Sequence, residues 1–141
     1  VTVILLLDFR SIIDAALAIM PVFIGFIGVF GVMGLVGMQV NFANLMVLPL
    51  IFGIGVDAGV HVVHRWRNQP DGIPAGLIGG TGQAITMTMA TTIIGFGSLL
   101  IAEHQGIRSL SIVMVTGLAI TWLACMVMLP AALRLRIRLN P

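Results

Sequence analysis

The feature that most constrains this chain is a series of apolar runs long enough to cross a bilayer. Four segments each approach or exceed the roughly 20 apolar residues that a helix needs to cross the hydrocarbon core. A shorter apolar run, VTVILLL, occupies residues 1–7 and is interpreted as the end of a longer helix. The expected fold class is an all-α membrane protein, a bundle of about four full transmembrane helices plus one truncated helix. The expected spans are 12–36, 42–63, 84–102 and 110–133.

Composition excludes a soluble domain and a nucleic-acid-binding function. Hydrophobic residues make up 59% of the 141 residues and charged residues only 9%, whereas about 25% of the residues of an ordinary globular domain are charged. The seven basic residues are all arginine, too few for a basic face that would bind nucleic acid. A single cysteine, Cys125, excludes an internal disulfide.

The arginines predict the orientation of the chain in the membrane. Six of the seven fall on one side of the expected zigzag of helices, and the positive-inside rule assigns that side to the cytoplasm. Residues 64–83 form the expected cytoplasmic loop, whose glycine-rich part fits a short interfacial helix, although a plain connector is the alternative. The six are Arg10, Arg65, Arg67, Arg134, Arg136 and Arg138, and Arg108 lies on the opposite side.

The second span places an acid inside the membrane. Asp57 belongs to the string FGIGVDAGVHVVHR and lies roughly 6 Å on the cytoplasmic side of the midpoint of 42–63. A charged aspartate at this depth costs about 3 kcal/mol, so we expect it to face protein or water rather than lipid. Helical spacing puts Leu50, Gly53, Asp57, His61 and His64 on one stripe.

Asp57 and His61 are the first members of a candidate proton relay. Carboxyl and imidazole groups exchange protons readily, and desolvation favours the neutral form of a carboxyl. The third span adds hydroxyl groups, because Thr88 and Thr91 share one helix face and Thr92 borders it. Threonines also satisfy backbone carbonyls in membrane helices, and an aspartate can be a purely structural hydrogen-bonding residue, so both alternatives remain open.

Other residues in the spans are expected to serve packing. In the first span glycine recurs every third residue, which leaves a smooth strip for the close approach of another helix. Trp122 lies in the middle of the last span and is expected to pack against a neighbouring helix. Asp14 and Glu103 lie near helix ends, where we expect them to be solvated. The strip consists of Gly25, Gly28, Gly31, Gly34 and Gly37.

The sequence offers little support for an enzyme or a metal site. The glycines at 53, 55 and 59 do not match GxGxxG, and the run at 79–82 lacks the P-loop lysine. His61 and His64 give only two metal ligands without a nearby third. An intramembrane enzyme would need a nucleophile and a base on facing helices. We therefore expect no enzymatic activity, no metal and no cofactor other than a proton gradient.

Three strings give the chain a family resemblance. GIGVDAGVHVVHRWR, TMATTIIGFGSLL and GIRSLSIVMVTGLAITWLACMVMLPAAL together resemble the resistance-nodulation-division (RND) superfamily, in particular its lipid-exporting MMPL-like branch and the hopanoid transporter group. The resemblance covers essentially the whole chain. It implies that these helices are the C-terminal transmembrane segment of a twelve-helix transporter, running from the end of the eighth helix to the twelfth.

This resemblance also implies a function and its partners. It implies a proton-driven pump in the bacterial inner (cytoplasmic) membrane that exports a lipid or another amphiphilic substrate. Asp57 matches the acid of the family's proton relay, but Ala58 stands where many members have a tyrosine, and the hydroxyl of the next helix maps loosely onto Thr91 or Thr92. The partners would be the N-terminal half and the periplasmic domains of the same protein, membrane lipids and the substrate, and a homo-oligomer is compatible.

Three other functions remain as alternatives. A lipid- or sterol-sensing receptor of the same fold would not pump, and in it the acid would only hold helices together. An auxiliary subunit of protein export is the second alternative, and an intramembrane enzyme is the third. Dissipating the proton gradient separates a pump from a receptor, because it stops only the pump.

Overall fold

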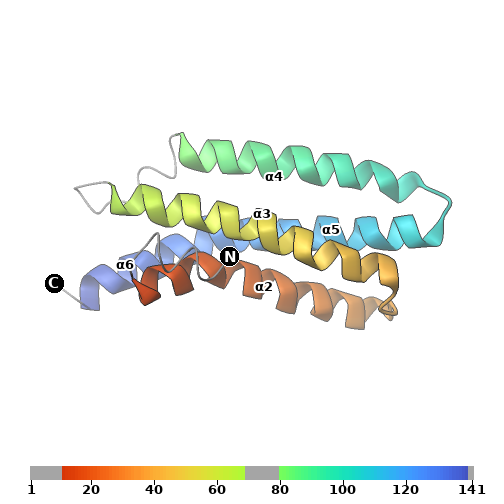
Figure 1. The fold of residues 1–141 in the computed structure, drawn as a ribbon, viewed down its shortest axis with the longest axis horizontal. Coiled ribbons are helices and arrows are strands. Elements are labelled where there is room, and N and C mark those ends of the chain that lie inside the picture. The colour runs from red at the N-terminus through yellow and green to blue at the C-terminus, as the bar shows by residue number, and fades with distance from the viewer. Residues whose placement is uncertain (1–10, 69–79, 140–141) are drawn as a thin grey trace.

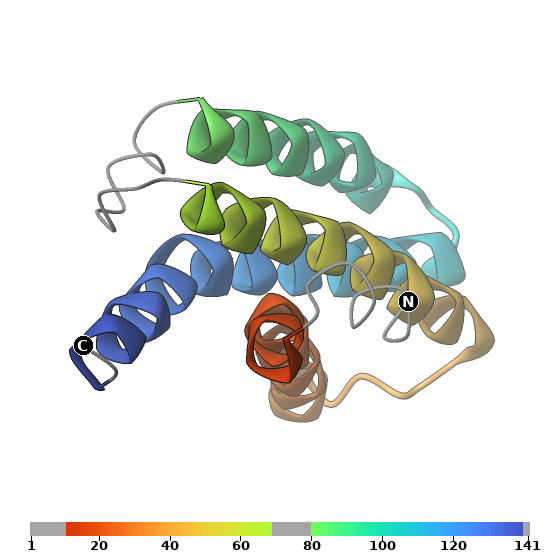
Figure 2. The same ribbon diagram turned by 60° about the vertical axis from the view of Figure 1, so that its left-hand side comes forward.

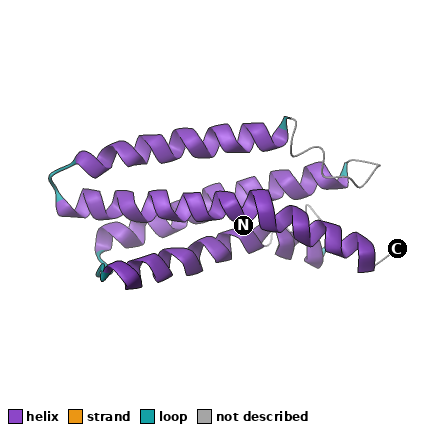
Figure 3. Ribbon diagram, turned by 180° about the vertical axis from the view of Figure 1, so that it is seen from behind, coloured by secondary structure: helices purple, strands orange, loops and turns teal. Residues whose placement is uncertain are grey.

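The computed structural model describes residues 11–68 and 80–139, and every regular element in this part of the chain is helical (Figures 1 and 3). The truncated helix expected at 1–7 lies outside the described residues. A 3₁₀ turn, η2 (Ser98–Ile101), extends α4, and a π-helical segment, η3 (Ala124–Met128), joins α5 to α6. The helices are α2 (Ile12–Val36), α3 (Phe42–Arg67), α4 (Thr81–Gly97), α5 (Gln105–Leu123) and α6 (Leu129–Leu139).

Four helices are long and apolar enough to cross a membrane, which confirms the expected fold class. The observed bounds differ from the expected ones at several ends. α3 continues past Val63 to Arg67, α4 begins at Thr81, and the last helix begins at Gln105 and continues through η3 into α6. Residues 64–67 and 81–83 of the expected loop are therefore helical, whereas its glycine-rich centre, 69–79, lies outside the described residues. The basic residues at the end of α3 favour this extension, because cations stabilise a helix C-terminus.

Short polar side chains fix where the helices begin. The Asp14 backbone N–H donates to the Ser11 hydroxyl over 3.5 Å, and the Asn44 N–H donates to Asn41 Oδ1 over 2.9 Å. These bonds satisfy N–H groups that have no partner within the helix. α2 ends at Gly37, whose φ of 67° is the left-handed conformation that glycine adopts readily. The prediction that Asp14 is solvated is wrong, because its side chain is only 4% exposed.

The helices form a bundle in which α2, α3 and α5 pack around a common core and α4 lies on its outside (Figure 2). Of the residues in the most apolar stretch of each helix, 11% are buried in α4 and 44% in α3. α4 is therefore the peripheral helix. It packs mainly against α5. Phe26 of α2 and Phe52 of α3 stack with ring centroids 6.2 Å apart. The largest fully buried side chains include Ile51, Met114 and Leu118.

Glycines set the close approach of the three core helices. A Cβ at Gly59 of α3 would overlap the carbonyl oxygen of Ala18 in α2, and one at Gly25 would overlap the hydroxyl oxygen of Thr121 in α5. The predicted glycine strip is therefore used only in its first part, at Gly25 and Gly28. Gly31 and Gly34 meet nothing within 4 Å among the described residues, and Gly37 serves as the helix cap.

A polar cluster joins α3 to α5 at one end of the bundle. The Ser109 hydroxyl donates to Asn44 Oδ1 over 2.6 Å, and Asn41 Nδ2 donates to the Ser109 oxygen over 3.2 Å. Asn44, only 2% exposed, also donates through Nδ2 to the Gln39 carbonyl over 3.2 Å. Since each buried polar atom of Asn44 has a partner, the cluster fixes the α2–α3 loop against the start of α5.

The last helix changes direction at η3 (Figure 2). A π-helical turn holds an extra residue and commonly marks a kink, and Pro130 just beyond it removes one helical N–H donor. α6 then ends at the same end of the bundle as α3, whereas α5 begins at the opposite end (Figure 1). The structure thus places Arg65, Arg67 and Arg134 at one end and Arg108 at the other, as the predicted zigzag requires.

Candidate functional site

The candidate site is built on α3, the helix that carries the acid. Gly55, Ala58 and Gly59 are buried and let α3 pack tightly against α2 and α5. Asp57 lies between them in sequence, and its side chain points away from that contact. Because α3 ends at Arg67 rather than at residue 63, Asp57 lies only about 4 Å from the helix midpoint. The structure thus places Asp57 close to the middle of α3.

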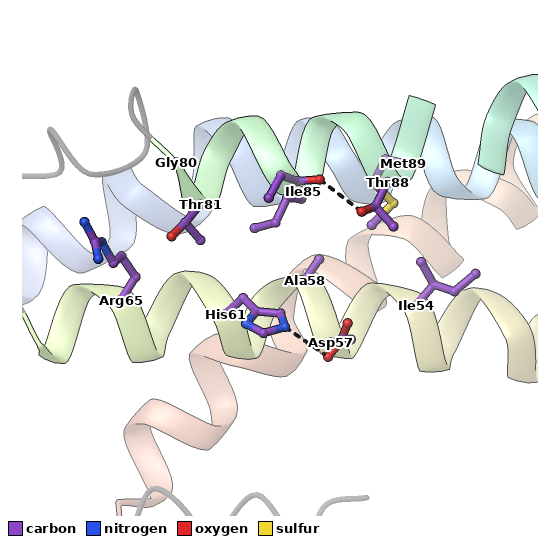
Figure 4. Close-up of a pocket in the computed structure, with 11 residues that line it drawn as sticks. Ile54, Asp57, Ala58, His61, Arg65, Gly80, Thr81, Ile85, Thr88 and Met89 are labelled. Carbon is purple, nitrogen blue, oxygen red and sulfur yellow. Dashed lines mark hydrogen bonds and ion pairs between the residues drawn. The ribbon is translucent and has the colours of Figure 1, made fainter. Parts of the chain in front are cut away.

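Asp57 and His61 form an ion-pair geometry one helical turn apart. His61 Nε2 lies 3.5 Å from Asp57 Oδ1, and the two side chains are 63% and 74% exposed (Figure 4). Residues at i and i+4 are neighbours on a helix surface, so this contact follows from the spacing of the sequence. The expected stripe is also observed, because Leu50, Gly53 and His64 are exposed like Asp57 and His61.

A pocket of about 400 Å³ opens between α3 and α4 beside these two side chains (Figure 4). α3 contributes Asp57, His61 and Arg65, and α4 contributes Thr81 and Thr88, with apolar side chains between them. One water takes about 30 Å³ of liquid volume, so the pocket has room for several. The lining therefore combines an acid, an imidazole, a guanidinium and hydroxyls around a space that water can fill.

The structure separates the three candidate threonines. Thr88 lines the pocket with Asp57, whereas Thr91 and Thr92 do not. All three hydroxyls donate to backbone carbonyls of α4: Thr88 to Ala84 over 3.0 Å, Thr91 to Thr88 over 2.9 Å and Thr92 to Thr88 over 2.8 Å. In each bond the hydroxyl proton is used, but the lone pairs of the hydroxyl oxygen remain available. Each threonine can therefore accept a further hydrogen bond, but it must break its bond to the backbone carbonyl before it can donate one elsewhere.

Arg65 belongs to the site although the sequence analysis did not predict it there. Its charge was used only to predict the orientation of the chain in the membrane. Arg65 lines the same pocket as Asp57 and His61. The spacing of the sequence could have predicted this position, because residues 57, 61 and 65 follow one another at intervals of four along one helix face. The acid, the imidazole and the guanidinium thus form a series over about 12 Å toward the end of the helix.

The described residues contain no group of three or more histidine, cysteine, aspartate or glutamate side chains that would hold a metal ion. His61 and His64 therefore have no third ligand of these types within the described part of the chain. The arrangement at Asp57 is suited to binding and moving a proton, because carboxyl and imidazole groups each gain and lose one readily.

Comparison with known proteins supports the family resemblance. A family model described as Patched SSD matches residues 5–135. The hopanoid transporters HpnN of Burkholderia multivorans and Rhodopseudomonas palustris are both 29% identical, over 130 and 131 residues, which is 92% and 93% of this chain. The chain spans only 14% and 15% of the length of these two relatives.

The chain matches a larger share of an archaeal relative. A membrane protein of Methanocaldococcus jannaschii, MJ1562, is 29% identical over 137 residues, which is 93% of this chain and 35% of that protein. No solved structure matches the chain. The match to the family model, over residues 5–135, includes the α3 and α4 segments that form the pocket.

Proposed function

The chain belongs to the Patched SSD family, and from this premise we propose that it is part of a lipid exporter driven by the proton gradient, with Asp57 as the proton-carrying acid. The observation that carries the proposal is Asp57 itself, near the middle of α3, 3.5 Å from His61 and beside a pocket with room for water. An intramembrane ionisable residue facing a cavity is typical of proton pathways.

In the proposed mechanism Asp57 alternates between a neutral and a charged form. The charged form is costly inside the membrane, so its proton affinity depends on which groups and how much water surround it. His61 is the neighbour that exchanges the proton, and the pocket beyond it extends to Arg65 and Thr81 near the end of α3. A change in this environment couples the gain or loss of a proton to helix movement.

The exposed stripe of α3 supports a partner outside this chain. Asp57 is 74% exposed within the described part of the chain, and Gly53 meets nothing within 4 Å there. A carboxylate cannot face lipid at low cost, so we infer that the N-terminal half of the same protein covers this face. A second acid on that half, opposite Asp57, would make the two carboxyls titrate as a coupled pair.

Cysteine cross-linking tests this partner. Gly53→Cys, paired with a cysteine at the symmetry-related position of the first half, should form a disulfide in the full-length protein. Gly95→Cys on α4, which also meets nothing within 4 Å, is the matched control for that same partner cysteine. Equal cross-linking at both positions, or none at Gly53, would contradict the assigned partner.

The proposed substrate is a lipid, and the proposed location is the bacterial inner membrane. Two of the relatives are hopanoid transporters, which supports an amphiphilic lipid substrate here. The role is transport rather than an enzymatic reaction, and the energy source is the proton gradient with no cofactor. The four apolar helices support a multi-pass membrane location.

The deciding experiment measures proton-driven lipid transport by Asp57→Asn. The full-length protein in proteoliposomes with an imposed pH gradient should lose transport of a hopanoid, because asparagine keeps the shape and removes the titrating proton. Glu103→Gln is the matched control, since it removes an exposed carboxyl in the loop between η2 and α5 and should leave transport unchanged. Transport that persists in Asp57→Asn and still stops with a protonophore would refute the role of Asp57.

A lipid-sensing receptor of the same fold is the second candidate. In a receptor, lipid binding would be unaffected by a protonophore, and Asp57→Asn would change helix packing rather than transport. Measuring lipid binding and lipid transport on the same variant separates the two functions.

A further inference from the structure

A second pocket lies on the other side of α4, between α4 and α5. Its volume is about 260 Å³, and its lining carries no charged side chain. The lining residues are Thr86, Met89, Ala90, Ile93 and Ile94 of α4 and Trp122 of α5. At membrane depth the molecules that surround such a pocket are lipids, so an apolar chain is the ligand that its lining suits.

This pocket is separate from the one beside Asp57. Met89, only 2% exposed, lines both and forms the wall between them. None of Asp57, His61 and Arg65 lines the second pocket. A ligand there would therefore contact the back of α4 and none of the proposed proton-carrying side chains.

One polar pair gives the second pocket a hydrogen-bonding group. Trp122 Nε1 donates to Thr86 Oγ1 over 3.1 Å. Thr88, Thr91 and Thr92 give their hydroxyl protons to backbone carbonyls, whereas Thr86 donates to none of the described residues. Since a hydroxyl can accept and donate at once, Thr86 keeps one donor for a ligand that carries an acceptor.

We propose that this pocket binds one acyl chain of a membrane phospholipid, with the ester carbonyl accepting a hydrogen bond from the Thr86 hydroxyl. Thr86 lies about 8 Å along the helix from the start of α4, close to the end of the bundle where α3 finishes. Ile94 lies about 12 Å deeper along the same helix. A phospholipid carries its ester carbonyl near the membrane surface and its chain toward the centre, which is the order of Thr86, Ala90 and Ile94.

Photo-cross-linking tests the site in the full-length protein. The protein is reconstituted into vesicles of ester-linked phosphatidylethanolamine in which a fraction of the acyl chains carries a diazirine, and labelled peptides are mapped by mass spectrometry. The expected result is labelling concentrated on residues 86–94. Ala90→Trp, which fills the pocket, should lower this labelling at least about fivefold, judged against the matched Ala16→Trp at an exposed position of α2. Equal labelling in both variants would overturn the proposal.

The carbonyl contact is tested without relying on a bulky substitution. Thr86→Val should lower labelling about two- to tenfold, the effect of losing one hydrogen bond. Thr91→Val, which removes a hydroxyl from the same helix outside the pocket lining, is the matched control and should retain the labelling. Ether-linked diazirine lipids, which lack the carbonyl, should label the wild-type protein as weakly as ester lipids label Thr86→Val. Equal labelling by ester and ether lipids would overturn the proposal.

This inference is independent of the proposed proton transport. Asp57→Asn should leave the labelling of residues 86–94 unchanged, because Met89 separates the two pockets. In Asp57→Asn, loss of transport with retained labelling would support both proposals. Retained transport with retained labelling in that variant would support the lipid site alone. Labelling spread evenly over all lipid-facing helices in the wild-type protein would show surface lipid only and would refute the site.

Discussion

The contact between Gly59 and Ala18 predicts that adding one methyl group will separate α2 from α3. A Cβ at Gly59 would overlap the Ala18 carbonyl oxygen and lie 3.0 Å from its carbonyl carbon, whereas ordinary contacts begin near 3.4 Å. The obstacle is backbone, so no side-chain rotation relieves it. The two helices must move apart by about 1 Å, which removes about half of the dispersion energy across the contact.

We expect Gly59→Ala to lower the free energy of unfolding by about 0–2 kcal/mol. The estimate combines the usual cost of inserting a methyl group into a packed core with the gain of about 1 kcal/mol from replacing a helical glycine. Gly31→Ala is the matched control, because Gly31 is also helical but meets nothing within 4 Å. That variant should be unchanged or more stable by up to about 1 kcal/mol.

Unfolding of the full-length protein by SDS in mixed micelles, followed by circular dichroism, measures both variants. Ala18→Gly should not rescue Gly59→Ala, because the clash involves the Ala18 backbone rather than its side chain. Equal stability of Gly59→Ala and Gly31→Ala would refute the close approach of α2 and α3 at this point. Rescue by Ala18→Gly would show that the contact is made by the side chain instead.

Three further predictions address the ends of the bundle and the threonine face. Asn44→Ala should cost about 1–3 kcal/mol in the same SDS assay, because it removes the hydrogen bonds of Asn44 to Ser109 and to the Gln39 carbonyl. An effect below about 0.5 kcal/mol would contradict the polar cluster. With Cys125 replaced if it labels, Gln105→Cys should react with an impermeant thiol reagent from the periplasm and Asn68→Cys only from the cytoplasm, and labelling of both from one side would refute the topology. Thr92→Ala should weaken transport only a few-fold, because water can replace a hydroxyl, and complete loss would indicate a direct role in proton transfer.

The amino-acid sequence alone was enough to predict the membrane character and the place of Asp57 inside an apolar helix. The length of an apolar run is a local property of the sequence, so the four spans could be predicted without a structure. The bounds of α2 are the predicted ones. The contact of Asp57 with His61 also follows from helical spacing alone. The helix ends were less predictable, because charged residues such as Arg65 and Arg67 can continue a helix beyond its apolar part.

Which helix faces meet could be learned only from the packing of the folded chain. The glycine strip of α2 has the same period throughout, yet Gly25 packs against α5 while Gly31 faces open space, because contact depends on where the neighbouring helix lies. In the same way Thr88 lines the pocket with Asp57 while Thr91 does not, although both share a helix face. Local periodicity fixes how residues are arranged around one helix, whereas the partner of each face is set by packing between segments far apart in the chain.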